Sequence, residues 1–234
     1  MLVEDAPRCV LAVYAHPDDP EIACGGTLAR WARAGSEVHV LLCTRGEKGS
    51  ADPKMKGADL ARRRAAEVAE AATVLGLASH QQLRIADGEL DNTTELRRDL
   101  VTAIRRLRPE AVICPDPTAV FFGNRYFNHH DHREVGWATL DAVAPAASNP
   151  HYFPNAGPVH RVARVFLSAT LDPDAWVDIS ETIDVKVDAL ACHKTQLDEA
   201  GEWFRGFVKE RAQEAGRAVG VAYAESFRLL SLSG

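Results

Sequence analysis

Residues 9–44 read CVLAVYAHPDDPEIACGGTLARWARAGSEVHVLLCT, and this stretch decides the fold. Its two apolar segments, 9–15 and 37–43, have the composition of buried strands. Residues 22–34 between them have helical spacing, and Gly35 suits the end of a helix. The stretch therefore predicts a strand–helix–strand unit with two parallel strands.

The same alternation continues along the 234 residues, a length that suits one domain. Further helices are predicted at 58–75, 94–107, 133–143, 181–197 and 199–215, and further strands at 82–85, 111–114, 162–168 and 175–179, before a terminal apolar run at 219–230. We therefore expect an α/β fold, a Rossmann-like three-layer sandwich with a mainly parallel sheet, in which residues 1–234 form a single domain.

Composition excludes several classes of protein. Hydrophobic residues make up 46% and charged residues 26%, as in ordinary folded domains, so disordered and fibrous classes are excluded. The net charge of −6 disfavours a nucleic-acid partner, and no apolar stretch is long enough for a membrane span. No signal-peptide pattern is present, and the five cysteines form no C-x-x-C motif, so we expect a cytoplasmic protein without a disulfide framework.

The first chemistry-bearing segment is AHPDDPEIACGGT, residues 15–27, which directly follows the first predicted strand. The carboxyl edge of an open parallel sheet is where α/β folds bind ligands. A turn brings residues three apart together, so His16 and Asp19 suit one metal ion, while Asp18 between them stays free as a base. The alternative is that one of the two aspartates only caps the following helix.

The second segment is NHHDHREVG, residues 128–136, with three histidines within four residues. It follows the strand at 111–114 and so reaches the same sheet edge. Two histidines and one carboxylate leave an open coordination position, which distinguishes catalytic zinc sites from closed structural ones. A histidine-rich surface loop is the alternative, but the two segments together favour a metal site.

Together these motifs resemble the LmbE-like, or PIG-L, family of zinc-dependent de-N-acetylases. The resemblance rests on AHPDD (15–19), GGT (25–27) and the later H-x-D-H (129–132), and it extends over TRGEKG (44–49), RAAE (64–67), ALACHKTQ (189–196) and AESF (224–227). These segments cover nearly the whole chain. The resemblance implies one LmbE-like deacetylase domain.

The resemblance also implies a role for each candidate residue. His16, Asp19 and His132 would bind zinc. Asp18 would be the general base, and His129 would act as an acid or stabilise the oxyanion, in protonated form on our physical account. Fe²⁺ or another divalent metal also suits such a donor set.

A substrate-binding role is implied for Arg64, although an arginine in the run ARRRAAE is usually part of a solvated helix face. The chain departs from the family pattern at two positions. Pro20 stands where many members have Glu or a small residue, and it suits the first turn of a helix. His130 replaces the usual Pro and leaves open which of the neighbouring histidines face the metal.

The function that the resemblance implies is hydrolysis of an N-acetyl or similar acyl group from a small amino-sugar derivative. Zinc activates water at neutral pH, and an aspartate base completes amide hydrolysis. Three alternatives remain: an iron(II) oxygenase, an amidase of thiol conjugates, and a catalytically silent metal- or sugar-binding homologue. Apolar and aromatic residues in the long loops make a homo-oligomer an expectation.

Overall fold

The computed structural model describes residues 1–197 and 203–232. Its centre is a seven-stranded sheet in the order β3-β2-β1-β4-β7-β9-β8. The strands are β1 (Cys9–Tyr14), β2 (Glu37–Thr44), β3 (Ser79–Ile85), β4 (Ala111–Pro115), β7 (Arg164–Ser168), β8 (Ala175–Asp178) and β9 (Ala224–Ser231). Pairing is parallel from β3 through β7, whereas β9 runs antiparallel to both of its neighbours. The predicted mainly parallel sheet is confirmed.

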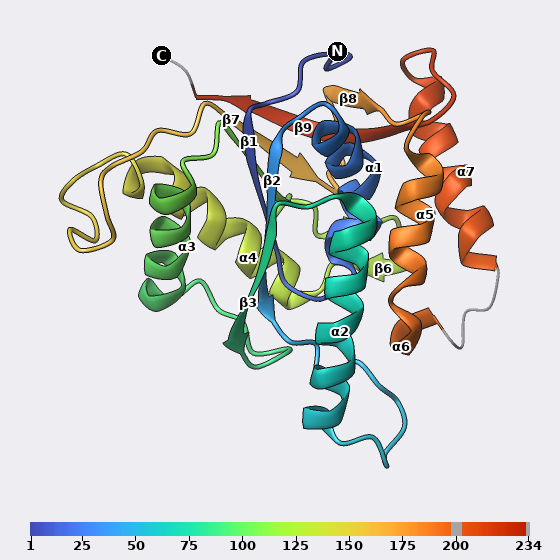
Figure 1. Ribbon diagram of the computed structural model, residues 1–234, viewed down its shortest axis with the longest axis horizontal. Helices are drawn as coiled ribbons and strands as arrows, with labels where there is room; N and C mark the ends of the chain where they lie inside the picture. Colours follow the sequence, from blue (N-terminus) through green and yellow to red (C-terminus); the bar gives the residue numbers. More distant parts are fainter. Residues whose placement is uncertain (198–202, 233–234) are drawn as a thin grey trace.

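Helices cover both faces of this sheet (Figure 1). They are α1 (Asp19–Arg33), α2 (Gly57–Leu75), α3 (Thr94–Leu107), α4 (His130–Asp141), the short π-helix η1 (Ala142–Ala146), α5 (Ile183–Ala191), α6 (Lys194–Leu197) and α7 (Trp203–Arg217). Helices α1, α2, α5 and α7 lie on one face, and α3 and α4 lie on the other. The three-layer arrangement expected from the sequence is therefore present.

Strand β1 shows why the two faces separate. Successive side chains of a strand point to opposite faces. Val10 and Ala12 belong to the apolar cluster beneath α1 and α2, whereas Leu11 and Val13 belong to the cluster beneath α3 and α4. Both sides of β1 are buried, which explains its uninterrupted apolar sequence.

Two helices begin earlier than the hydrophobic spacing predicts. Helix α1 starts at Asp19 rather than Ile22, and it is kinked at Cys24, where the backbone leaves helical geometry. Helix α4 starts at His130 rather than Arg133. In both cases the extra first turn is polar, so hydrophobic periodicity does not detect it, and it carries residues of the two candidate motifs.

The C-terminal part differs more from the prediction. The helix expected over 181–197 is divided into α5 and α6, because the N–H groups of Cys192 and His193 bond three residues back and close the first helix. Of the helix expected over 199–215, residues 199–202 lie outside the described part of the chain, and the remainder belongs to α7. The terminal apolar run contributes β9.

The long loop after β4 contains a short antiparallel hairpin, β5 (Phe121–Phe122) and β6 (Tyr126–Phe127), whose aromatic side chains are largely exposed. Within residues 1–197 and 203–232, no helix is both long and apolar enough to cross a lipid bilayer.

Candidate metal centre and active site

The turn after β1 holds the first group of candidate residues. Asp19 accepts a hydrogen bond from the backbone N–H of His16 (2.8 Å), which closes the turn. Asp18 occupies the N-cap position of α1, but its side chain makes no capping bond, and its φ of 90° is in the left-handed region that L side chains rarely adopt. Neither aspartate serves as a side-chain cap of α1, and such strain is typical of functional sites.

Three side chains from the two motifs meet at one point. His132 Nε2 lies 3.1 Å from Asp19 Oδ1 and 3.2 Å from His16 Nδ1, and His16 Nδ1 lies 3.4 Å from Asp19 Oδ2. The potential ligand atoms of all three lie within 4.8 Å of one another. Two imidazoles and one carboxylate are a donor set that divalent zinc accepts, so these residues fit the metal that the resemblance implies.

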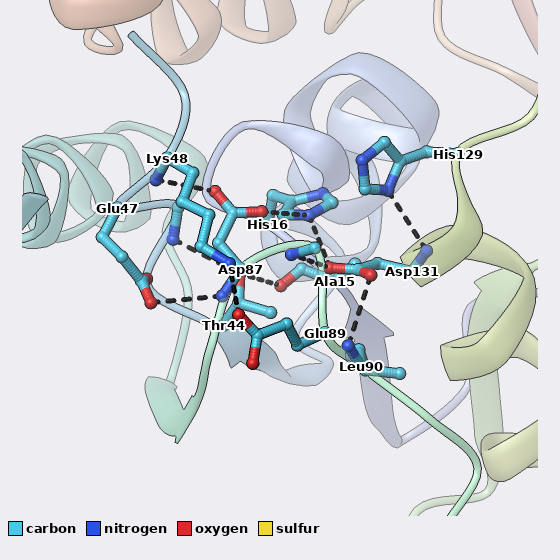
Figure 2. A network of polar contacts seen from close by, with 12 residues as sticks. Ala15, His16, Thr44, Glu47, Lys48, Asp87, Glu89, Leu90, His129 and Asp131 are labelled. Atoms are coloured by element: carbon cyan, nitrogen blue, oxygen red, sulfur yellow. Dashed lines mark hydrogen bonds and ion pairs between the residues drawn. The ribbon is translucent and has the colours of Figure 1, made fainter. Parts of the chain in front are cut away.

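The other ring nitrogen of His16 faces two carboxylates (Figure 2). His16 Nε2 lies 3.1 Å from Asp131 Oδ2 and 3.1 Å from Asp87 Oδ1. Burial alone would lower the pKa of His16, but the contacts with Asp131, Asp19 and Asp87 raise it well above its usual value. A carboxylate behind a ligating histidine orients the ring and increases its basicity, so His16 is arranged to present Nδ1 to a metal.

Asp131 and Asp87 are themselves held in place. The fully buried Asp131 accepts backbone hydrogen bonds from Gly88 (2.8 Å) and Leu90 (3.4 Å). Asp87 accepts one from the backbone N–H of Lys48 (3.0 Å). The sequence did not lead us to Asp87. Its position could have indicated it, because Asp87 stands two residues after a parallel strand and so lies at the same edge of the sheet. The polar composition of β3 made this strand hard to predict, and its carboxyl end was therefore not considered.

His129 lies beside the centre, with its ring centroid 5.0 Å from that of His16. Its Nδ1 accepts a hydrogen bond from the backbone N–H of Asp131 (3.1 Å), and a protonated ring has no lone pair to accept it. Burial and the nearby His16 lower the pKa of His129. The hydrogen bond from Asp131 therefore favours a neutral ring with its hydrogen on Nε2, whereas the sequence led us to expect a protonated His129; the part that His129 plays in the reaction stays a prediction.

His130 is directed away from this group, and its Nε2 lies 3.3 Å from the exposed Asp91. The ambiguity that His130 created in the sequence is thereby removed, because it belongs to none of the donor groups in the described part of the chain.

Two further donor groups exist among the described residues. One comprises His16, His129 and Asp131 and adjoins the first. Its Asp131 already binds two backbone N–H groups, which makes it less available as a ligand. The other comprises Cys9, Glu37 and His39 at the amino edge of the sheet. Burial, Glu37 and Glu110 raise the pKa of the Cys9 thiol to about 11, so it stays protonated at neutral pH.

Arg64 is brought beside Asp18 by α2. Its buried guanidinium donates to the carbonyl of Gly46 (3.1 Å) and to Asp18 Oδ2 (3.1 Å), and it also bonds the carbonyl of Pro17. A Cβ on Gly46 would lie 2.1 Å from Nη1 of Arg64, so the TRGEKG motif provides the space that this arginine needs. These contacts hold the turn that carries Asp18. A direct role of Arg64 in binding substrate stays a prediction.

The electrostatic environment of Asp18 suits a base. Burial raises the pKa of its carboxyl to about 7, although the neighbouring Arg64 opposes this effect. Burial would likewise raise the pKa of Asp19, but the contacts with His132 and His16 lower it below its usual range. Two adjacent carboxylates therefore differ in proton affinity: Asp19 stays ionised at neutral pH, whereas Asp18 can exchange a proton there.

Other segments that resemble the family contribute to the interior rather than to the site. Glu225 of the AESF segment accepts hydrogen bonds from the backbone N–H groups of Gly26 (3.0 Å) and Thr27 (2.7 Å) in GGT. Lys186 neutralises this buried carboxylate and donates to the carbonyl of Ile22 (2.7 Å).

Comparison with known proteins identifies the family of the chain. The family model for PIG-L, described as GlcNAc-PI de-N-acetylase, matches residues 11–143, which is more than half of the chain. The chain therefore belongs to the PIG-L family. The matched region contains both candidate motifs, residues 15–27 and 128–136.

The matches to individual proteins extend over most of the sequence. The chain is 34% identical to the diacetylchitobiose deacetylase of Thermococcus kodakarensis, with 94% of this chain and 82% of the relative covered. It is 30% identical to a 1D-myo-inositol 2-acetamido-2-deoxy-alpha-D-glucopyranoside deacetylase of Rhodococcus jostii, with 82% and 83% covered. The solved N,N'-diacetylchitobiose deacetylase of Pyrococcus horikoshii superimposes with a TM-score of 0.88 at 31% identity, covering 96% of this chain and 84% of that one.

Proposed function

We propose that the protein is a zinc-dependent hydrolase that removes an N-acetyl or similar acyl group from a small amino-sugar derivative, and that residues 1–234 form one such domain. The observation that carries this proposal is the convergence of His16, Asp19 and His132 beside Asp18, which caps nothing. The named substrates of the relatives from Thermococcus kodakarensis and Rhodococcus jostii contain N-acetylated glucosamine, which supports the substrate class.

His16 Nδ1, one carboxylate oxygen of Asp19 and His132 Nε2 would hold the metal. Zinc in this position supplies Lewis acidity, since it acidifies water and polarises an amide carbonyl. The remaining work belongs to the protein. Asp131 and Asp87 hold His16 in the orientation that presents Nδ1.

Asp18 is the proposed general base. A carboxylate with a pKa of about 7 accepts a proton from attacking water near neutral pH and can return that proton to the leaving amine. The bond from Arg64 (3.1 Å) fixes the orientation of the carboxylate. Nitrogen protonation completes cleavage of the C–N bond and releases the free amino sugar and the acid.

His129 is proposed to stabilise the transition state as a neutral donor. Because its Nδ1 accepts the backbone N–H of Asp131, its hydrogen is on Nε2, which suits donation to an oxyanion. A neutral imidazole stabilises the developing charge without adding a permanent cation beside the two ligating histidines.

Acetate and free-amine release across a panel of N-acetylglucosamine derivatives, including N,N'-diacetylchitobiose, tests the proposal. We expect release that a chelator abolishes and added Zn²⁺ restores. His132→Ala should lose the metal because it removes one of three ligands. Metal analysis after anaerobic purification identifies the native ion, and iron with no acetate release would favour the oxygenase alternative.

Tight sugar binding without acetate release from any panel member would overturn the hydrolase proposal and favour the silent homologue. Release of amine only from thiol conjugates would favour the amidase alternative. We propose the cytoplasm as the location of the reaction.

A further inference from the structure

Asn128 makes three hydrogen bonds that connect the β5–β6 hairpin to a proposed metal ligand. Its backbone N–H donates to the carbonyl of Val120 (2.7 Å), its Nδ2 donates to the carbonyl of Ala119 (3.0 Å), and its Oδ1 lies 3.1 Å from His132 Nδ1. The side chain is buried, with the residue 4% exposed. Because a carbonyl oxygen cannot donate a hydrogen bond, Ala119 must face the NH₂ group, and the amide oxygen of Asn128 must face His132.

This orientation determines which nitrogen of His132 carries hydrogen. An amide oxygen only accepts, so Nδ1 of His132 must be the donor. Its other nitrogen, Nε2, is the atom that lies 3.1 Å from Asp19 Oδ1 and 3.2 Å from His16 Nδ1. We propose that Asn128 is a positioning residue that holds His132 as the Nδ1–H tautomer and so presents Nε2 to the metal. This inference rests on the proposed metal site.

The two histidines are held in opposite ways. His16 uses Nδ1 toward the centre because the carboxylates of Asp131 and Asp87 hold its Nε2. His132 uses Nε2 because a neutral amide holds its Nδ1. A carboxylate at position 128 would face the Ala119 carbonyl oxygen without a hydrogen between them. Asparagine therefore meets two demands at once, accepting from His132 and donating to Ala119.

These two demands can be separated by substitution. Asn128→Asp keeps an acceptor for His132 but loses the donor to Ala119, whereas Asn128→Leu loses both at similar size. Zn²⁺ dissociation constants of the full-length wild type and both variants, measured by chelator competition, distinguish the two roles. Loss of a group that orients a ligand weakens metal affinity by about 10–100-fold, and we expect this loss for Asn128→Leu.

We expect Asn128→Asp to bind Zn²⁺ nearly as tightly as the wild type, while the unfolding midpoints of both metal-free variants fall through the loss of the hairpin anchor. Equal losses of affinity in the two variants, or unchanged affinity in Asn128→Leu, would overturn the inference. If the wild type binds no Zn²⁺, that result would overturn both the proposed function and the inference about Asn128.

A measurement on the wild type covers the case in which a variant fails to fold. Long-range ¹H–¹⁵N correlation spectra of the Zn²⁺-loaded wild type distinguish the two imidazole tautomers, and sequential resonance assignment identifies the ring of His132. The inference requires hydrogen on Nδ1 of His132 and a metal-bound Nε2. Hydrogen on Nε2 would contradict it.

Discussion

Two groups of charged side chains contact α1. The group around His16 lies at the first residue of the helix, Asp19, and the group around Lys186 contacts residues 22–27. The two groups differ in how their charges are arranged. Around Lys186, each charge faces its complement: Glu225 accepts from Lys186 and from two backbone N–H groups, and Lys186 also binds a backbone carbonyl. Around His16, ligand atoms of three side chains face one another within 4.8 Å. Four carboxylates lie in or beside this second group, at Asp18, Asp19, Asp87 and Asp131.

The difference separates a structural charge network from a functional one. A buried pair whose donors and acceptors all match can be explained by the needs of the fold alone. Lone pairs that converge on one point are electrostatically costly, and a cation at that point relieves the cost. Substitutions around Lys186 should therefore change stability, and substitutions around His16 should change metal binding or rate.

Asp18→Asn gives the largest expected effect. Asparagine keeps the size of the side chain and an acceptor for Arg64, but it cannot take a proton. Loss of a general base lowers kcat by about 10²–10⁴-fold, and we expect such a loss with unchanged Zn²⁺ stoichiometry. Acetate release from the best substrate of the panel, together with metal analysis, measures both quantities. An undiminished rate would refute the assignment of Asp18.

Glu225→Gln tests the structural side of the comparison. The substitution leaves the buried ammonium of Lys186 without its carboxylate, and breaking a buried pair in this way costs about 3–5 kcal/mol of unfolding free energy. Denaturant unfolding measures the loss. The activity of the protein that remains folded should change little, because Glu225 contacts none of the proposed ligands.

The matched control is the double variant Lys186→Met/Glu225→Gln. Removing both charges abolishes the unpaired cation, so the double variant should be more stable than Glu225→Gln alone. A single variant as stable as the wild type would show that this pair does not support the fold.

Gly25 and Gly26 adjoin the Lys186–Glu225 pair, and substitutions of these glycines should have a smaller effect on the free energy of unfolding. A Cβ on Gly26 would lie 2.7 Å from Cδ1 of Ile179, whereas the nearest atom to a Cβ on Gly25 is Cγ of Lys186 at 3.4 Å. Overpacking of this kind costs about 1–3 kcal/mol, so Gly26→Ala should lower the free energy of unfolding by that amount. Gly25→Ala is the control and should be tolerated. Equal stability of the two variants would contradict the packing argument.

These results also define what the sequence alone could predict. The apolar runs of β1, β2 and β4 and the turn residues after them predict the parallel sheet, and parallel strands bring their carboxyl ends to one edge. That is why the segments that hold His16, Asp19 and His132, 116 residues apart at most in the sequence, could be grouped before the structure was known, and the family resemblance then singled out His132 among the neighbouring histidines.

Contacts that depend on side-chain direction could not be predicted. Asp87 follows a polar strand and gave no hydrophobic signal, and the orientation of the His129 ring depends on one backbone N–H group at the start of α4. The break between α5 and α6 was missed because the hydrophobic spacing continues across it. That break carries His193, whose ring is fully buried.

His193 supports the smallest predicted effect, a dependence of stability on pH. Its Nε2 lies 3.3 Å from Glu21 Oε2. Burial would lower the pKa of His193, but Glu21, Asp18 and Glu67 together raise it. A histidine with a raised pKa in the folded state stabilises the fold below its unfolded-state pKa of about 6.5, and this contribution disappears as the pH rises through the folded-state pKa.

The advantage of the wild type over His193→Gln in unfolding free energy should therefore be greatest below about pH 6.5 and should shrink as the pH rises. Denaturant unfolding of the wild type and His193→Gln at a series of pH values and constant metal content measures this difference in unfolding free energy. Titratable groups that both proteins share contribute equally to the two values and cancel. Glu21→Gln should weaken the same dependence, because it removes the partner that raises the pKa. A difference that stays constant across this range would mean that folding leaves the pKa of His193 unchanged, and a difference that grows as the pH rises would mean that the ring is neutral in the folded protein. Either result would refute an ion pair between His193 and Glu21.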